Sequence, residues 1–102
     1  MIYIIQFERP LGNDRHSARY YIGWCEDGKS HERLKAHQRG NGAAITRAAN
    51  ALGIKYHIIC TLEGDRNTER LLKRMKNTPR ILRQIQKRRF TLTKVRTYLW
   101  TD

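Results

Sequence analysis

Three short segments rich in β-branched and aromatic residues limit the folds open to this chain, because each predicts a strand rather than a helix. The first is Met1–Phe7, and the second is Arg19–Trp24, which we expect to run antiparallel to it. The stretch between them, Glu8–Arg19, contains Pro10 and several turn-forming residues, so it predicts a long hairpin loop. The third segment, Ile54–Leu62, alternates so that one predicted strand face carries Ile54, Tyr56, Ile58, Cys60 and Leu62.

Two helices are expected between the second and third strands. Ser30 is placed to cap a helix that runs to about Arg39 and ends at the glycines that follow. Ala43–Leu52 predicts a second helix, closed by Gly53.

Two more helices are expected after the third strand. Asp65 or Asn67 can cap the first of them, and Thr78 with Pro79 resembles the cap and first position of the next. The predicted core positions of these two helices are Leu71, Leu72 and Met75, then Ile81, Leu82 and Ile85. The tail, Phe90–Trp100, has the composition of a strand, and an ordered arm is the alternative.

The order β-β-α-α-β-α predicts an α+β fold, a small three-stranded antiparallel sheet flanked by helices. We assign residues 1–80 to one domain. Residues 81–102 are expected to form a basic C-terminal helix and strand extension, packed on or next to the same domain. A chain of 102 residues is long enough to bury one core of its own.

The charge of the chain points to a polyanionic partner. Twenty-one Lys and Arg residues against nine Asp and Glu leave a net charge of +12, and the basic residues are denser after residue 66. We therefore expect DNA as the partner, with RNA as an alternative. A solvated basic surface or an affinity for anionic membranes is the other explanation. The residues expected to contact nucleic acid are Arg47, Lys73, Lys76, Asn77, Arg80, Lys87, Arg88 and Arg89.

The sequence also indicates where the chain acts. No apolar run approaches the roughly 20 residues that a membrane-spanning helix needs, and the first ten residues have the pattern of a strand rather than of a signal peptide. Cys25 and Cys60 are expected to be reduced thiols. We expect an intracellular protein, cytoplasmic or associated with the nucleoid.

Five polar residues form a minimal set for metal-assisted attack of water on a phosphodiester: Tyr3, Tyr21, Arg33, His37 and Glu69. The transition state gathers charge on oxygen atoms, so a cation has to lie beside it. A single carboxylate such as Glu69 suits Mg²⁺ (or Mn²⁺), which keeps several waters and takes further ligands from phosphate. Arg33 can contact two phosphate oxygens, and His37, four residues later, is expected on the same helix face, directed at the same phosphate.

The tripeptides Met1-Ile2-Tyr3 and Tyr21-Ile22-Gly23 resemble the two signatures of the GIY-YIG nuclease superfamily. The resemblance extends over residues 1–79 through Arg33-x-x-x-His37, Glu69 and the stretch Gly42–Arg47. It implies a metal-dependent endonuclease in which a tyrosine activates water, and we assign that role to Tyr3, with Tyr21 orienting the water. Two features depart from the family pattern: the gap between the tripeptides is longer, and the asparagine, Asn77, comes early.

Each of these residues also has a purely structural interpretation: aromatic packing, an exposed helix face, or an ion pair between Glu69 and Lys73. Their occurrence together favours the nuclease. A second hypothesis is a helix-turn-helix regulator in which residues 55–61 form the recognition helix, although this composition favours a strand. A third is a nuclease fold that binds nucleic acid without cleaving it.

Overall fold

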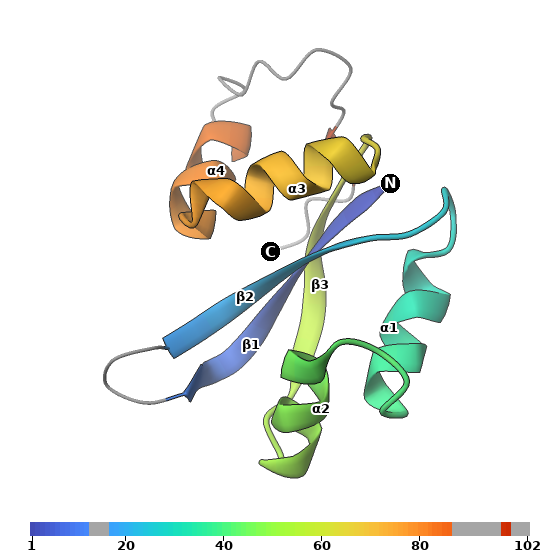
Figure 1. The fold of residues 1–102 in the computed structure, drawn as a ribbon, viewed down its shortest axis with the longest axis vertical. Helices are drawn as coiled ribbons and strands as arrows, with labels where there is room; N and C mark the ends of the chain where they lie inside the picture. Colours follow the sequence, from blue (N-terminus) through green and yellow to red (C-terminus); the bar gives the residue numbers. More distant parts are fainter. Residues whose placement is uncertain (13–16, 87–96, 99–102) are drawn as a thin grey trace.

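The computed structural model describes residues 1–12, 17–86 and 97–98 (Figure 1). Its elements follow the expected α+β order: β1 (Ile2–Gly12), β2 (Ser17–Trp24), α1 (Ser30–Gln38), α2 (Ala44–Ala51), β3 (Tyr56–Leu62), α3 (Arg66–Met75), α4 (Thr78–Gln86) and β4 (Thr97–Tyr98). The sheet order is β2-β1-β3-β4, and every pairing is antiparallel. The predicted three-stranded sheet is thus confirmed, with a two-residue strand added beside β3.

The first two strands extend into the stretch that was expected to be a long loop. Only residues 13–16 separate β1 from β2, so that prediction is wrong. The pairing shifts register between Gln6 and Leu11, and β3 pairs with β1 no further than Phe7. Pro10 therefore lies in an irregular part of the hairpin, without β3 beside it. A missing N–H interrupts the sheet least at such a position.

A bulge in β3 overturns the prediction that its alternate residues share one face. Ile4 pairs with Cys60, while the next residue, Ile5, pairs with Ile58, so Ile59 is the extra residue. Because one inserted residue reverses the alternation of side chains, Ile58 packs on one side of the sheet and Cys60 on the other.

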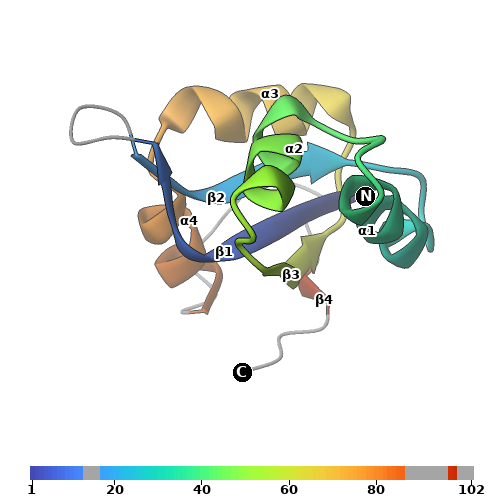
Figure 2. The ribbon, with the colours of Figure 1, turned by 90° about the horizontal axis from the view of Figure 1, so that it is seen from below.

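Two pairs of helices cover the two sides of the sheet (Figures 1 and 2). On one side, α3 and α4 complete a core cluster of Ile2, Ile4, Ile22, Cys60, Leu62, Leu72, Ile81 and Leu82. On the other side, α1 and α2 cover a cluster of Tyr3, Ile5, Phe7, Leu11, Cys25, Ala49, Ile54 and Tyr56. The alternation of β1 therefore divides its own side chains between two different cores.

The helix ends differ from expectation at two positions. Ser30 is the first residue of α1 rather than its cap, and Lys29 precedes it without a capping side chain. Asp65 caps α3 as expected, because its carboxylate accepts the Thr68 backbone N–H at 2.9 Å. Asn77, rather than Thr78, supplies the capping oxygen of α4, which accepts the Arg80 backbone N–H at 3.2 Å.

The core stripe of α3 is narrower than predicted. Leu72 is buried, but Leu71 and Met75 are 46% and 41% exposed, so these two core assignments are wrong. In α4, Ile81 and Leu82 are buried as expected, whereas the side chain of Ile85 lies outside the described residues. Of the tail strand, only Thr97–Tyr98 is described.

The helix-turn-helix hypothesis is wrong, because the stretch it needs as a recognition helix lies in β3, within the sheet. Among the helices of residues 1–12, 17–86 and 97–98, none is long and apolar enough to cross a membrane.

Candidate active site

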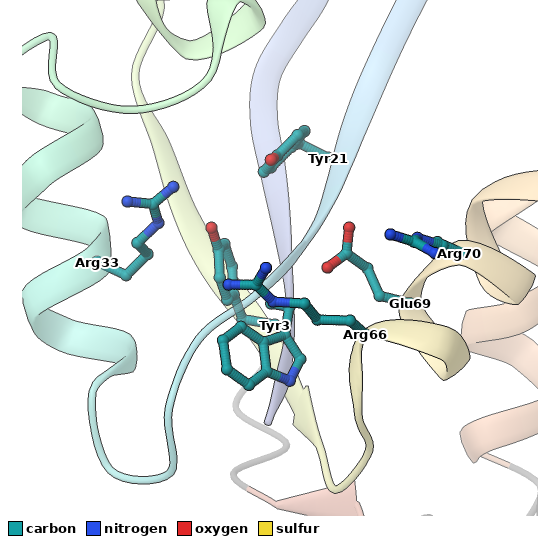
Figure 3. Close-up of a pocket in the computed structure, with 7 residues that line it drawn as sticks. Tyr3, Tyr21, Arg33, Arg66, Glu69 and Arg70 are labelled. Carbon is teal, nitrogen blue, oxygen red and sulfur yellow. The ribbon is translucent and has the colours of Figure 1, made fainter.

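A cavity of about 260 Å³ opens at the β2 edge of the sheet, between α1 and α3 (Figure 3). We call it the tyrosine cavity, and it is lined by Tyr3, Tyr21, Trp24, Arg33, Arg66, Glu69 and Arg70. Four of the five residues predicted to be catalytic thus meet in one cavity, although they come from β1, β2, α1 and α3. His37 is the exception.

The two tyrosines lie near each other because of the β1–β2 register. Tyr3 pairs with Gly23, and Tyr21 pairs two residues further along β1, so the rings are diagonal neighbours with centroids 6.3 Å apart. Gly23 is needed there, since a Cβ atom at this position would overlap the phenol end of Tyr3. The glycine therefore leaves room for the Tyr3 ring beside the neighbouring strand.

His37 lies behind Tyr3 rather than in the cavity wall. The ring is fully buried, and its Nε2 is 2.7 Å from the Tyr3 hydroxyl. The expectation that His37 and Arg33 face the same phosphate is therefore corrected: only Arg33 reaches the cavity directly. Their separation by four residues aligns them along α1, but the tyrosine ring lies between His37 and the opening.

The other ring nitrogen of His37, Nδ1, contacts the start of α2. Nδ1 accepts the backbone N–H of Ala43 at 3.2 Å and lies 3.0 Å from the Thr46 hydroxyl. The Thr46 hydroxyl itself donates to the Ala43 carbonyl at 2.8 Å. Acceptance of the Ala43 N–H favours the neutral tautomer with the proton on Nε2. In that tautomer His37 donates to the Tyr3 oxygen, and the phenol proton of Tyr3 is left to donate into the cavity. Gly42 is also required, because a Cβ atom there would overlap the imidazole.

Burial keeps both members of this pair uncharged. It lowers the pKa of His37 to about 4, with the nearby Arg33 charge acting in the same direction. Burial also raises the pKa of Tyr3 to about 12, and a hydrogen bond with Arg33 opposes that rise. In the protein alone, Tyr3 therefore holds its proton at neutral pH. The hydrogen bond with Arg33 would stabilise the phenolate, and so would His37 in the tautomer with its proton on Nε2.

Glu69 is the carboxylate of the tyrosine cavity, and its side chain is only 17% exposed. Its Oε1 lies 2.8 Å from the Lys73 ammonium, which is also 5.1 Å from the centre of the Tyr21 ring. The ion pair considered from sequence is therefore present, and it lies within the candidate site.

Glu69 is the carboxylate that could bind a metal ion in the tyrosine cavity. In the described part of the chain, no three His, Cys, Asp or Glu residues are grouped to hold a metal ion. The single carboxylate Glu69 would leave a bound ion most of its waters, which is compatible with the ligand preferences of Mg²⁺. It does not fit a metal that needs an all-protein cage.

Three arginines surround this carboxylate. Arg33 enters from α1, and Arg66 and Arg70 come from the α3 turn that carries Glu69. The Arg66 guanidinium also lies 4.6 Å from the centre of the Trp24 ring. Two buried donors in the wall, Arg33 Nε and Trp24 Nε1, have no hydrogen-bond partner among the described residues. Donors thus outnumber acceptors, which is the arrangement expected of a site for an anion.

Sequence reasoning missed Trp24, Arg66 and Arg70 as lining residues. In a chain with this many arginines, nothing in the sequence distinguished Arg66 and Arg70 from solvent-exposed arginines. Their spacing was nevertheless informative, because residues 66, 69 and 70 share one face of a helix that begins at Arg66. Trp24 directly follows the Tyr21-Ile22-Gly23 tripeptide and is the last residue of β2, so it lies at the same edge of the sheet as Tyr21.

Of the residues predicted to contact nucleic acid, those that the structure describes lie on both sides of the sheet. Arg47 lies on α2, on the opposite side of the sheet from α4, and its guanidinium donates to the Gly42 carbonyl at 2.9 Å. Lys76 ends α3 with a left-handed backbone, and Arg80 is exposed on α4. Asn77 uses its side-chain oxygen as a helix cap, as described above. Outside the described residues lie Lys87, Arg88 and Arg89.

Comparisons of the chain with protein-family models, with curated proteins and with solved structures each found no match.

Proposed function

We propose that this protein is a metal-dependent endonuclease that hydrolyses phosphodiester bonds in DNA, as the sequence resemblance to GIY-YIG nucleases implies. One observation carries the proposal: two phenols, three guanidinium groups and one carboxylate line the same cavity at a sheet edge. Residues from four separate elements supply these groups, so their meeting is a property of the fold rather than of a local charge run.

Arg33, Arg66 and Arg70 are the groups that bind and polarise the phosphate. A guanidinium meets two phosphate oxygens at once, and it stays charged at any physiological pH. Arg33 forms a hydrogen bond with Tyr3, so we assign to Arg33 the stabilisation of the negative charge that develops in the transition state. The two arginines of α3 hold the phosphate from the other wall.

Tyr3 is the proposed base for the attacking water, and its pKa determines how much of the active phenolate is present. Only the phenolate can take a proton, and its fraction increases tenfold with each pH unit below a pKa of about 12. His37 Nε2–H and Arg33 stabilise that phenolate. The single-turnover rate should therefore rise with pH through neutrality. Tyr21, whose ring is a diagonal neighbour of Tyr3, orients the water.

Glu69 is the residue that would hold the divalent metal. When bound, Mg²⁺ (or Mn²⁺) supplies charge neutralisation on the phosphate and the leaving oxygen. Lys73 then acts as the counter-charge of this carboxylate at 2.8 Å.

The direct test is incubation of the purified protein with branched, nicked and linear DNA, with Mg²⁺ and with chelator. Mg²⁺-dependent cleavage of at least one substrate is expected, and chelator should abolish it. RNA of matched sequence serves as the comparison for the nucleic acid. Failure to cleave any of these substrates, in Mg²⁺ or in Mn²⁺, would contradict the proposal.

A second candidate is a nuclease fold that binds nucleic acid without cleaving it. The observation that favours it is the state of the two key groups: Glu69 is already paired with Lys73, and the raised pKa of Tyr3 keeps the phenol protonated. Tight, salt-dependent DNA binding without cleavage would support this alternative.

We also propose that the protein acts inside the cell, in the cytoplasm or at the nucleoid, where DNA is present. Both cysteines are free thiols and both are buried, as expected of a protein in a reducing compartment.

A further inference from the structure

A second cavity, of about 460 Å³, adjoins the tyrosine cavity. We call it the α1 cavity. Its lining is Trp24, Cys25, Glu26, Lys29, Glu32, Arg33, Ala36 and Arg66. Three of these residues, Trp24, Arg33 and Arg66, also line the tyrosine cavity, so a nucleotide whose phosphate lies in one has its neighbour within reach of the other. Its volume is in the range of pockets that hold small organic ligands.

Beyond the two arginines that it shares with the tyrosine cavity, the α1 cavity does not suit a phosphate. Glu26 and Glu32 lie in its wall, and Lys29 is 3.6 Å from the Glu32 carboxylate, which leaves that lysine already paired. Carboxylates repel a phosphate but accept hydrogen bonds from amino groups. Because Arg33 and Arg66 stand between the two cavities, the backbone of a nucleic acid is expected at the arginines and a neutral group beyond them.

The surface shared by the two cavities suits a flat aromatic ring. The Arg66 guanidinium is 4.6 Å from the centre of the Trp24 ring, and nucleobases stack on both tryptophan rings and guanidinium planes. Trp24 Nε1 is itself buried, so the donors that this wall offers to a base carbonyl are the guanidinium groups of Arg33 and Arg66. Ala36, one turn beyond Arg33 on the same face of α1, keeps this part of the helix surface small.

We propose that the α1 cavity binds an unpaired nucleobase beside the scissile phosphate and prefers cytosine. This inference rests on the proposed function and narrows its substrate to DNA that has an unpaired nucleotide next to the cleavage position. Cytosine offers an amino group to the carboxylates and a carbonyl oxygen to a donor. Uracil has the same size but carries an oxygen in place of that amino group, so the carboxylates should reject it.

The test is equilibrium binding of the full chain carrying Glu69→Gln, so that bound DNA is not cleaved. The DNA is a duplex with a single-stranded flap, in which each unpaired position at the branch point carries cytosine, uracil or an abasic residue in turn. At one position, the abasic substrate should bind about 5-fold to 100-fold more weakly than the cytosine substrate, the range that stacking of one base supplies. Uracil should bind there about fivefold more weakly than cytosine.

Two variants separate stacking from amino-group recognition. The double variant Glu26→Ala and Glu32→Ala should bind the cytosine and uracil substrates equally well. It should still bind the abasic substrate more weakly than the cytosine substrate. Trp24→Ala should reduce the difference in affinity between the cytosine and the abasic substrate. Glu8→Ala removes an exposed carboxylate of β1 away from both cavities, so both ratios should stay as in the parent.

Equal affinity for cytosine, uracil and abasic substrates at every position would overturn this inference. If the native protein still cleaves flap DNA in Mg²⁺, the proposed function survives that result and only the base site is lost. Absence of any DNA binding would overturn both.

Discussion

The two sides of the sheet are built from different chemistry, although β1 contributes to both. Under α3 and α4 the buried cluster is aliphatic except for Cys60. Under α1 and α2 the buried groups include Tyr3, His37 and Thr46, joined by hydrogen bonds. One strand therefore serves two purposes by alternation: its even positions, Ile2 and Ile4, build an apolar core, and Tyr3 between them enters a polar network.

The difference between the two sides predicts different responses to substitution. An apolar core depends mainly on the volume that its side chains fill, so loss of volume lowers the free energy of unfolding. A buried polar network depends on every partner, because a donor or acceptor left alone keeps its desolvation cost. Substitutions under α3 and α4 should therefore change stability, and those under α1 and α2 should change activity as well.

Leu72→Ala should have the largest effect on stability. Leu72 is 1% exposed in the aliphatic cluster, and truncating such a side chain typically lowers the free energy of unfolding by about 2–5 kcal/mol. Denaturant unfolding measures this loss. Leu71→Ala is the matched control, because Leu71 is 46% exposed and should cost less than about 0.5 kcal/mol. The cleavage rate of the folded fraction should be unchanged in both variants, and a lower rate in Leu72→Ala would contradict the division between the two sides.

Arg33→Lys should have the largest effect on chemistry. Lysine keeps the charge but loses the planar pair of donors, so the single-turnover rate is expected to fall about 100-fold to 1,000-fold with little change in DNA affinity. Arg39→Lys, at the exposed end of α1, is the control and should cleave normally. If Arg33→Lys weakens DNA binding and leaves the single-turnover rate unchanged, Arg33 only binds the phosphate.

Acid should destabilise the protein through His37. Its pKa is about 4 in the folded state and 6.5 as the ordinary value, so the unfolded chain binds the proton first. The resulting contribution is complete above pH 6.5 and is lost as the pH falls toward 4, by about 3 kcal/mol at 1.36 kcal/mol per pKa unit. Unfolding measured between pH 7 and pH 4 should show this slope. In His37→Gln the slope should be smaller, and an unchanged slope would assign it to other groups.

Thr46→Val should produce the smallest of these effects. The hydroxyl near His37 Nδ1 is lost, which removes a buried hydrogen bond and lowers stability by about 1–3 kcal/mol. A less constrained ring should also lower the cleavage rate, whereas Thr46→Ser, which keeps the hydroxyl, should restore it. Equal rates in all three proteins would show that Tyr3 does not depend on this network.

The sequence was sufficient to predict the element order, because periodicity and turn residues act locally. Tyr3, Tyr21, Arg33 and Glu69 were also correctly expected to lie together, since the two tripeptides pair in one hairpin and both helices pack beside it. The depth of His37 was not predictable from its spacing to Arg33. Whether a ring four residues along a helix reaches solvent depends on which tertiary neighbour covers it, here Tyr3.

Two other predictions were wrong for the same reason, because tertiary packing decided the outcome. The bulge at Ile59 leaves no mark in a sequence that alternates regularly, yet it moves Cys60 to the other side of the sheet. Likewise, Leu71 and Met75 have the spacing of a core stripe, but the sheet is covered by one turn of α3 through Leu72 and by α4. Local pattern indicates that a helix is amphipathic, and the packing partner decides how wide its buried face is.

The most direct test of the proposed active site is the single-turnover cleavage of DNA in Mg²⁺ by the native protein and by Glu69→Gln, with DNA affinity measured in parallel. Glu8→Gln, an exposed carboxylate of β1, is the control for a lost charge. Glu69→Gln should abolish cleavage while DNA affinity stays equal or increases, because a negative charge near the phosphate is removed. Near-normal cleavage by Glu69→Gln would contradict the account.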